Sequence, residues 1–212
     1  MASIFGSIPA QTTKRRVFFS FHYQNDIWKV NQVRNSWRYN HENTRESEGF
    51  FDGSIWESSR RTGPESLKSL IRDGIKNTSV TCVLVGAATY ERRWVRYEVA
   101  RSVIKGNGLL AVKINLMGNQ QGYLSQEGPN PLDYMGVYNA GGVIRLAEIK
   151  NGKWVRYEDY AQAVDLPATW IKPHDANVIR LSRYAGLYCY KTQNGGANFS
   201  SWVNQAASDV GR

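Results

Sequence analysis

The stretch of residues 78–116 constrains the fold of this chain more than any other. Residues 78–85 and 109–116 are two short apolar runs, and the segment between them, residues 90–105, has the periodicity of an amphipathic helix. Three valines recur at every fourth position of that segment: Val95, Val99 and Val103. Gly106 follows, as is common after the end of a helix. A buried strand, a helix and another buried strand are the unit from which parallel sheets are built.

The same alternation runs through the amino-terminal part of the chain. Residues 15–21 are a β-prone run, and Asn25 or Asp26 is the predicted cap of the helix that follows. A short strand is expected over residues 49–52, and Pro64 is expected to open the next helix. This order of elements predicts an α/β fold with a doubly wound, mostly parallel sheet and helices on both faces.

The pattern changes after residue 116. Residues 117–138 are rich in Gly, Pro, Asn and Gln and are predicted to form a long loop. The pair Asn151–Gly152 separates two β-prone runs, which is a strong β-hairpin signal. A last helix is expected over residues 198–207, with Asn198 as its cap. A C-terminal extension of a hairpin and a helix is therefore predicted.

The chain of 212 residues is long enough for one sizeable hydrophobic core. We predict a flexible leader over residues 1–13 and a single domain over residues 14–212. Within that domain, residues 14–116 are the predicted α/β core and residues 117–212 the elaborated C-terminal part.

Basic residues outnumber acidic ones, 27 to 18, and give a net charge of +9. They occur in short, separated pairs: Arg15–Arg16, Arg60–Arg61 and Arg92–Arg93. A solvated surface is the interpretation that we favour. A field that attracts nucleotides is the second interpretation, and a face that binds duplex nucleic acid is the third.

The chain lacks the signatures of several common sites. It has no Gly-x-Gly-x-x-Gly fingerprint, no P-loop and no Gly-x-Ser-x-Gly elbow. Two cysteines and three dispersed histidines predict neither a disulfide framework nor a metal site. No secretory signal is visible, and no apolar run is long enough to cross a bilayer. We therefore expect a cytoplasmic protein with no membrane partner.

The helix after residue 86 carries the most distinctive chemistry. Trp94 and Glu98 are four residues apart, so a ring and a carboxylate share one helix face. This face is expected at the carboxyl edge of the sheet, where open α/β sheets bind ligands. A carboxylate in that place would bind and activate a ribose. The alternative is that Glu98 pairs with Arg93 or Arg101 on the surface, where such pairs contribute little.

Three further residues are expected at the same edge. Ser20 and His22, near the end of the first strand, would offer a hydroxyl and an imidazole to phosphate or ribose oxygens. Asp52, at the end of the second strand, would bind a ribose hydroxyl. For each residue the alternative is a local role, with Ser20 and Asp52 capping turns and His22 lying in a loop.

The pentapeptide Trp-Val-Arg-Tyr-Glu occurs twice, over residues 94–98 and 154–158. The second copy follows the Asn151–Gly152 turn and is expected in a strand, where its first and last residues are about 13 Å apart. In a helix the same two residues are neighbours. We predict the first copy to be the site and the second to be a coincidence.

Five segments together resemble TIR-like domains, and in particular the ThsB family of the Thoeris anti-phage system. Residues 17–23 look like the first strand of these domains, residues 78–86 like the central strand, and residues 92–98 like the helix with tryptophan followed by glutamate. Residues 128–134 and 199–204 extend the likeness to the C-terminal part.

The resemblance implies a flavodoxin-like fold and an enzyme with NAD+ as its substrate and no other cofactor. In such enzymes a helix glutamate holds the ribose attached to nicotinamide. The bond to nicotinamide breaks, and the ADP-ribose is closed into a messenger of the cyclic ADP-ribose type. Carried onto this chain, the resemblance makes Glu98 the catalytic residue and places Phe19, Ser20, His22 and Trp94 around the substrate.

The resemblance also implies partners. The messenger would activate a separate effector of the ThsA type, which depletes the cell of NAD+. The residues leave open the phage trigger, the assembly into homo-oligomers and the roles within the substrate-covering loop expected over residues 38–50. Two other functions stay as alternatives: a non-catalytic TIR-like scaffold that signals by homotypic assembly, and a nucleic-acid-binding module, which the scattered basic residues make the least favoured.

Overall fold

The computed structural model of the protein describes residues 15–39, 63–174 and 176–212. The strand predicted over residues 49–52, including Asp52, lies outside the described residues. So do residues 40–50 of the predicted substrate-covering loop and the predicted leader.

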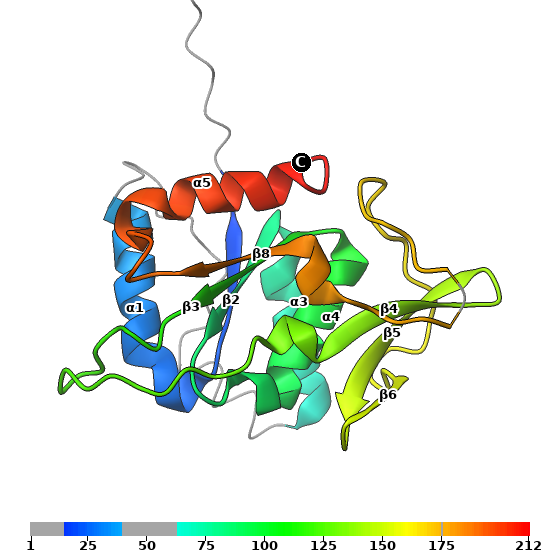
Figure 1. The fold of residues 1–212 in the computed structure, drawn as a ribbon, viewed down its shortest axis with the longest axis horizontal. Helices are drawn as coiled ribbons and strands as arrows, with labels where there is room; N and C mark the ends of the chain where they lie inside the picture. The colour runs from blue at the N-terminus through cyan, green and yellow to red at the C-terminus, as the bar shows by residue number, and fades with distance from the viewer. Residues whose placement is uncertain (1–14, 40–62, 175) are drawn as a thin grey trace, which may run out of the picture.

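A four-stranded parallel sheet lies at the centre of the molecule (Figure 1). Its strands, in spatial order, are β1 (Val17–Ser20), β2 (Val80–Val85), β3 (Gly108–Lys113) and β8 (Ala185–Cys189). Every residue of β2 is buried, as expected for a strand that is covered on both faces. The mostly parallel sheet and the flavodoxin-like fold class predicted from the sequence are confirmed.

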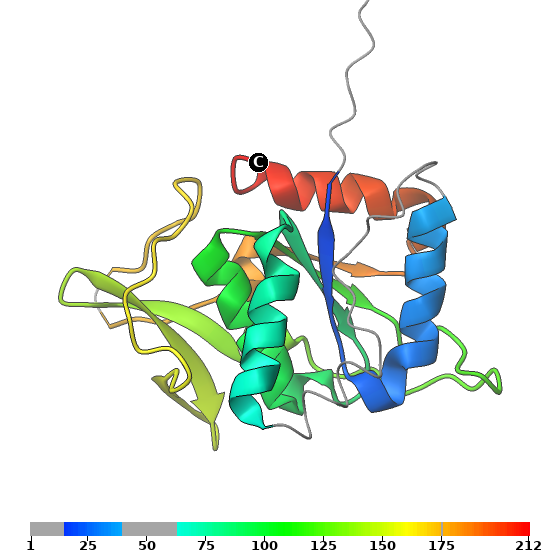
Figure 2. The same cartoon turned by 180° about the vertical axis from the view of Figure 1, so that it is seen from behind.

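Helices cover both faces of this sheet (Figures 1 and 2). One face packs against α1 (Tyr23–Tyr39) and α5 (Gly195–Ser208), and the other against α3 (Pro64–Lys76) and α4 (Arg93–Lys105). Side chains of a strand alternate between the two faces. Phe19 therefore joins the core under α1 and α5, and Phe18 joins the core under α3.

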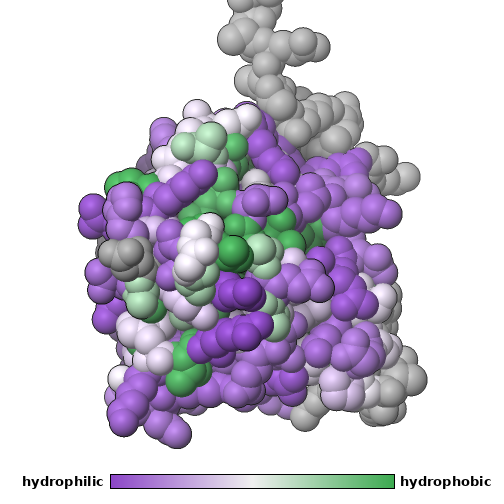
Figure 3. Space-filling model, turned by 90° about the vertical axis from the view of Figure 1, so that its right-hand side faces the viewer, coloured by the Kyte–Doolittle hydropathy of each residue, from purple (hydrophilic) through white to green (hydrophobic). Residues whose placement is uncertain are grey.

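A second, antiparallel sheet packs beside α4. It is ordered β6-β5-β4-β7 and is built from β4 (Met135–Ala140), β5 (Val143–Lys150), β6 (Lys153–Arg156) and β7 (Ile179–Arg180). Met135 and Leu146 share a buried cluster with Val99 of the helix. The outer face on this side shows apolar side chains gathered near its middle, with hydrophilic ones around them (Figure 3).

The predicted hairpin is confirmed, since Asn151 and Gly152 connect β5 and β6 with φ of 50° and 73°. The long loop predicted over residues 117–138 was too long at its end, because β4 begins at Met135 and pairs with β5. The described residues also form three short 3-10 helices: η1 (Thr89–Glu91), η2 (Pro131–Asp133) and η3 (Leu181–Tyr184).

Two predicted helix caps are wrong. The first helix begins at Tyr23, and the cap is His22, whose Nδ1 accepts a hydrogen bond from the backbone N–H of Asn25 at 3.3 Å. The last helix begins at Gly195 and not after Asn198, because Asn194 adopts a left-handed conformation with φ of 49° immediately before it. At both places the helix begins a few residues before the predicted cap.

The predicted core and C-terminal part share one set of layers. Although β8 and α5 follow residue 116 by many positions, β8 pairs with β3 and α5 packs against the same sheet. None of the helices in the described part of the chain has the length and apolar character needed to cross a bilayer.

Candidate active site

Glu98 is held inside the molecule by the packing of α4. Val95, Val99 and Val103 form the buried stripe of this helix, as the sequence predicted. Glu98 lies beside that stripe and is only 5% exposed. Its Oε2 accepts a hydrogen bond from Oγ of Ser20 at 2.5 Å, so the last residue of β1 is directly joined to the helix.

The environment of Glu98 favours the protonated carboxyl group. Burial raises the pKa of Glu98 to about 8, and the hydrogen bond from Ser20 partly offsets this rise because it stabilises the carboxylate. A carboxyl group with a strongly perturbed pKa at the binding edge of an α/β sheet is a candidate for catalysis.

The surface ion pair considered as an alternative for Glu98 is contradicted. Arg93 instead bonds Asp159, with its Nη2 at 2.8 Å from Oδ1, and Arg101 lies over the ring of Tyr160 at 5.8 Å. Glu98 has neither arginine as an ion-pair partner.

Trp94 lies one helical turn before Glu98 and is half-buried. Its ring meets that of Tyr97 edge-on, with centroids 6.1 Å apart and planes at 84°. The guanidinium of Arg93 lies over the Trp94 ring, 5.3 Å from its centroid. Trp94 also packs against the apolar cluster that contains Phe18. The indole is thus anchored by neighbours of α3 and α4.

His22 is buried at the carboxyl end of β1, where it caps α1. Burial lowers the pKa of His22, and the nearby charge of Arg92 lowers it further. The ring is therefore neutral near pH 7, which agrees with Nδ1 acting as an acceptor.

The structure brings Ser20 to Glu98 but does not bring Phe19 there. Phe19 points to the opposite face of the sheet, where its ring stacks on Phe199 with centroids 5.8 Å apart. The substrate-binding roles of Ser20, His22, Trp94 and Phe19 stay predictions, and Asp52 lies outside the described residues.

The sequence around this site matches a known protein family. A family model described as "Thoeris protein ThsB, TIR-like domain" matches residues 18–119, which include Ser20, His22, Trp94 and Glu98. A curated protein of Bacillus cereus (strain MSX-D12), "Putative cyclic ADP-D-ribose synthase ThsB1", is 42% identical over 197 residues, or 90% of this chain and 99% of that protein. The chain belongs to the ThsB family of TIR-like proteins. The resemblance predicted from the sequence is confirmed.

Two buried charged residues of this ThsB-family chain, Asp26 and Lys29, were not predicted as features of the carboxyl edge. Asp26 and Lys29 are both only 3% exposed, and Oδ2 of Asp26 has no hydrogen-bond partner. The ammonium of Lys29 donates to Oγ of Ser125 at 2.7 Å. Their positions in the sequence could have predicted this burial, because Asp26 and Lys29 have the helical spacing that places them on the same face of α1 as Val30 and Val33.

The side chain of Asp26 also explains the glycine at position 86, immediately after β2. A Cβ atom at Gly86 would lie 2.1 Å from Oδ2 of Asp26, so any other residue there would require the buried Asp26 side chain to move. Among the described residues, no group of three or more His, Cys, Asp or Glu side chains is placed to hold a metal ion.

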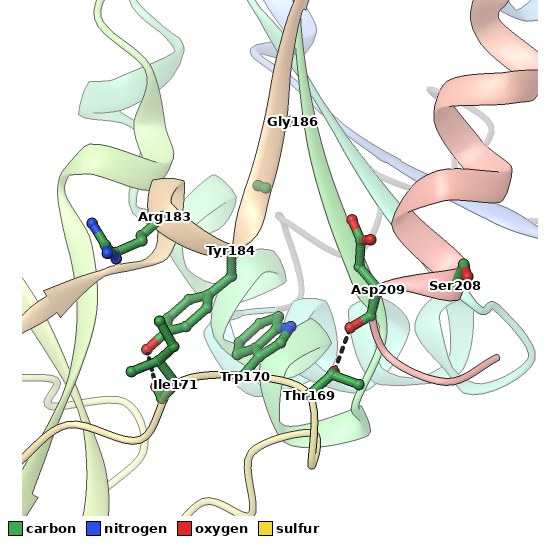
Figure 4. Close-up of a pocket in the computed structure, with 9 residues that line it drawn as sticks. Thr169, Trp170, Ile171, Arg183, Tyr184, Gly186, Ser208 and Asp209 are labelled. Carbon is green, nitrogen blue, oxygen red and sulfur yellow. Dashed lines mark hydrogen bonds between the residues drawn. The ribbon is translucent and has the colours of Figure 1, made fainter.

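A separate cavity of about 750 Å³ lies at the amino end of β8 (Figure 4). Trp170 and Tyr184 stack beside it with ring centroids 4.3 Å apart, and the hydroxyl of Tyr184 donates to the backbone oxygen of Ile171 at 2.6 Å. Thr169 donates to the backbone oxygen of Asp209. These contacts fasten the loop before β7 to η3 and to the end of α5.

Proposed function

We propose that this protein cleaves NAD+ at the bond between nicotinamide and ribose and closes the ADP-ribose into a messenger of the cyclic ADP-ribose type. The observation that carries the proposal is the buried Glu98 carboxyl joined to Ser20 at 2.5 Å. The name of the Bacillus cereus relative, a cyclic ADP-D-ribose synthase, agrees with this chemistry.

A single acid is sufficient for the first step. Nicotinamide in NAD+ is cationic, so it leaves with the electron pair of the glycosidic bond and becomes neutral without receiving a proton. The positive charge passes to the ribose, whose transition state resembles an oxocarbenium ion. An ionised Glu98 beside that sugar would stabilise the developing charge and orient the ribose hydroxyls.

The pKa of Glu98 couples catalysis to substrate binding. Because its pKa is about 8 in the free protein, most of the carboxyl is protonated at neutral pH. A bound cation favours the ionised form, so substrate binding is expected to release the proton of Glu98. The charge needed in the transition state is then formed when the substrate is in place.

The second step joins a hydroxyl of the same ADP-ribose to the anomeric carbon, and the hydroxyl proton is released. Water competes for that carbon, so cyclisation requires a pocket from which water is excluded. Trp94, packed against Tyr97 beside Glu98, would supply an apolar wall.

In the proposed defence function, the messenger diffuses to a ThsA-type effector that depletes NAD+ after a phage trigger. The enzyme itself needs no resident cofactor or metal, because the substrate carries its own leaving group. Assembly into homo-oligomers belongs to the same proposal, and all these partners are cytoplasmic.

The proposal is tested by incubating the protein with NAD+, with and without lysate from phage-infected cells. Nicotinamide and cyclic ADP-ribose are then followed by chromatography. Glu98→Gln keeps the shape of the side chain and removes its charge, and we expect it to abolish turnover. Glu158→Gln is the matched control, since Glu158 ends the second copy of the pentapeptide, is exposed and pairs with Lys150 at 2.8 Å.

Turnover that survives Glu98→Gln would exclude this acid as the catalytic group. A wild-type protein that releases no nicotinamide under either condition would instead support the non-catalytic scaffold. Equal losses in Glu98→Gln and Glu158→Gln would point to general damage and count against the assignment.

A further inference from the structure

Basic side chains gather at the amino edge of the central sheet, opposite the edge at which β1 ends in Ser20. Both α3 and α4 end at this edge. Their last two turns carry Arg72 and Lys76 on α3 and Arg101 and Lys105 on α4, and these four side chains line one cavity of about 340 Å³. Cations four residues apart on one helix repel each other, so this arrangement has a cost.

A second cavity of about 350 Å³ adjoins the first. The two share Lys76 and Lys105, and the second adds Arg15 and Arg16 from the segment before β1. Thr78 and other polar residues of the connection between α3 and β2 complete its lining. Three separate parts of the chain thus bring six cationic side chains to two contiguous hollows, although no basic run exists in the sequence.

Among the described residues that line the two cavities, basic side chains outnumber acidic ones. Asp73 is the carboxylate that lines the first cavity, and no carboxylate lines the second. Within the described part of the chain, Lys76 and Lys105 form no ion pair, whereas Lys68 is paired with Glu65 and Asp159. Each helix C-terminus adds only about half a negative charge. The six cations therefore leave the edge strongly positive.

Hydrogen bonds of two arginines, Arg212 beside the cavities and Arg72 in the first one, hold positive charge at this edge. The guanidinium of Arg212 donates to the backbone oxygens of Lys105 and Thr78 and to Oδ1 of the buried Asn107. Arg72 is held by the hydroxyl of Tyr97 at 3.2 Å. Burial lowers the pKa of Lys105, and the charge of Arg212 lowers it further, as expected where neighbouring cations lack counterions.

We propose that this amino edge is a binding site for a ligand that carries two or more phosphate groups. Two adjoining hollows that share two lysines could each hold one of two successive phosphate groups. The guanidinium group of an arginine can donate two parallel hydrogen bonds to the oxygens of one phosphate. Lys105 is seven residues from Glu98, about 10 Å along α4, so the site is distinct from the proposed catalytic pocket. The phosphates can belong to a free nucleotide or to a nucleic-acid strand.

Three probes distinguish these sources: inorganic pyrophosphate, ATP and a fluorescent single-stranded oligonucleotide of about 20 nucleotides. Binding is measured by calorimetry for the first two and by fluorescence anisotropy for the third, at ~0.05 M and ~0.2 M salt. The test variant is Lys76→Glu with Lys105→Glu. The control is Lys153→Glu with Lys191→Glu, which changes the net charge equally at exposed positions outside both cavities.

We expect the test variant to weaken binding of at least one probe by about tenfold or more and the control to weaken it by about twofold or less. A pair of neutral changes, Lys76→Gln with Lys105→Gln, should give an intermediate loss if the charge-reversed variant folds poorly. Preference for the oligonucleotide, with a steep salt dependence, would identify a nucleic-acid ligand. Preference for ATP or pyrophosphate would identify a free one.

The proposal is overturned if no probe binds to the wild type at the lower salt, or if test and control variants lose affinity equally. Nicotinamide release by the test variant is measured in parallel and should stay within about twofold of wild type, since neither lysine contacts Glu98. A failed binding test with intact turnover therefore overturns this inference and leaves the proposed enzyme in place.

Discussion

Removing the hydroxyl of Ser20 should shift the pH dependence of the enzyme in a defined direction. In the wild type, that hydroxyl donates to the Glu98 carboxylate at 2.5 Å and holds its pKa at about 8, below the value that burial alone would give. Ser20→Ala removes the donor and destabilises the ionised form. The pKa of Glu98 must therefore rise.

The size of the shift follows from the strength of the bond. A hydrogen bond to a charged group contributes about 1.5–3 kcal/mol, which corresponds to about one to two pKa units. At pH 7, about one tenth of Glu98 is ionised in the wild type and about a hundredth to a thousandth in Ser20→Ala. If the ionised form is the active one, kcat/KM at pH 7 should fall by about ten- to a hundredfold.

The assay is the initial rate of nicotinamide release at NAD+ concentrations far below KM, from about pH 6 to about pH 9.5. The wild-type kcat/KM should rise with pH through about 8, and the variant should lag and recover part of its loss at the alkaline end. Ser102→Ala is the matched control. The Ser102 hydroxyl donates at 2.7 Å to the backbone oxygen of Glu98 and not to its carboxyl group.

An unmoved midpoint in Ser20→Ala would refute the reasoning, even if the rate fell uniformly at every pH. A shift of the same size in Ser102→Ala would do so as well, because it would trace the effect to the position of the helix and not to the hydrogen bond.

Three further outcomes are expected. Glu98→Gln should be more stable than wild type at pH 9 by up to roughly 5 kcal/mol. The pKa of Glu98 is about 8 in the folded protein and 4.5 in its usual state, so the wild type loses stability as the pH rises between these values. Thermal unfolding of both proteins at about pH 5 and about pH 9 measures the difference. Gly86→Ala should cost about 2–3 kcal/mol in denaturant unfolding, since its Cβ would meet the buried Asp26, whereas Gly196→Ala, with open space around its Cβ, should change stability little. Phe19→Leu should lower the unfolding free energy by about 1.5 kcal/mol and leave KM for NAD+ within about twofold; a large rise in KM with unchanged stability would restore a substrate-binding role for Phe19.

The local elements could be predicted because their signals are contained in short windows. The valine stripe of α4 and the Asn151–Gly152 turn are examples. The two copies of Trp-Val-Arg-Tyr-Glu mark the limit of that approach. Residues 94–98 are helical, whereas residues 154–156 form the end of a strand, and the flanking sequence decides between the two conformations.

What could not be predicted depends on contacts between distant residues. Alternation along β1 separates Phe19 from Ser20, but which face meets α4 is decided by the packing of the whole sheet. Likewise, the buried carboxyl of Asp26 was interpreted as a cap, because Gly86, which lies against it, is sixty residues away in the sequence. Sequence patterns therefore predicted the helix of Glu98, but not the full set of side chains around that residue.

The position of β8 has a consequence for how the molecule is made. This strand docks beside β3 about seventy residues later in the chain, with the antiparallel sheet inserted between them. A nascent polypeptide that ends before residue 185 leaves β3 with a bare edge, and Val112 lacks the cover of α5. Completion of the sheet therefore waits until residues 185–208 have been synthesised, and β1, β2 and β3 alone do not make the finished fold.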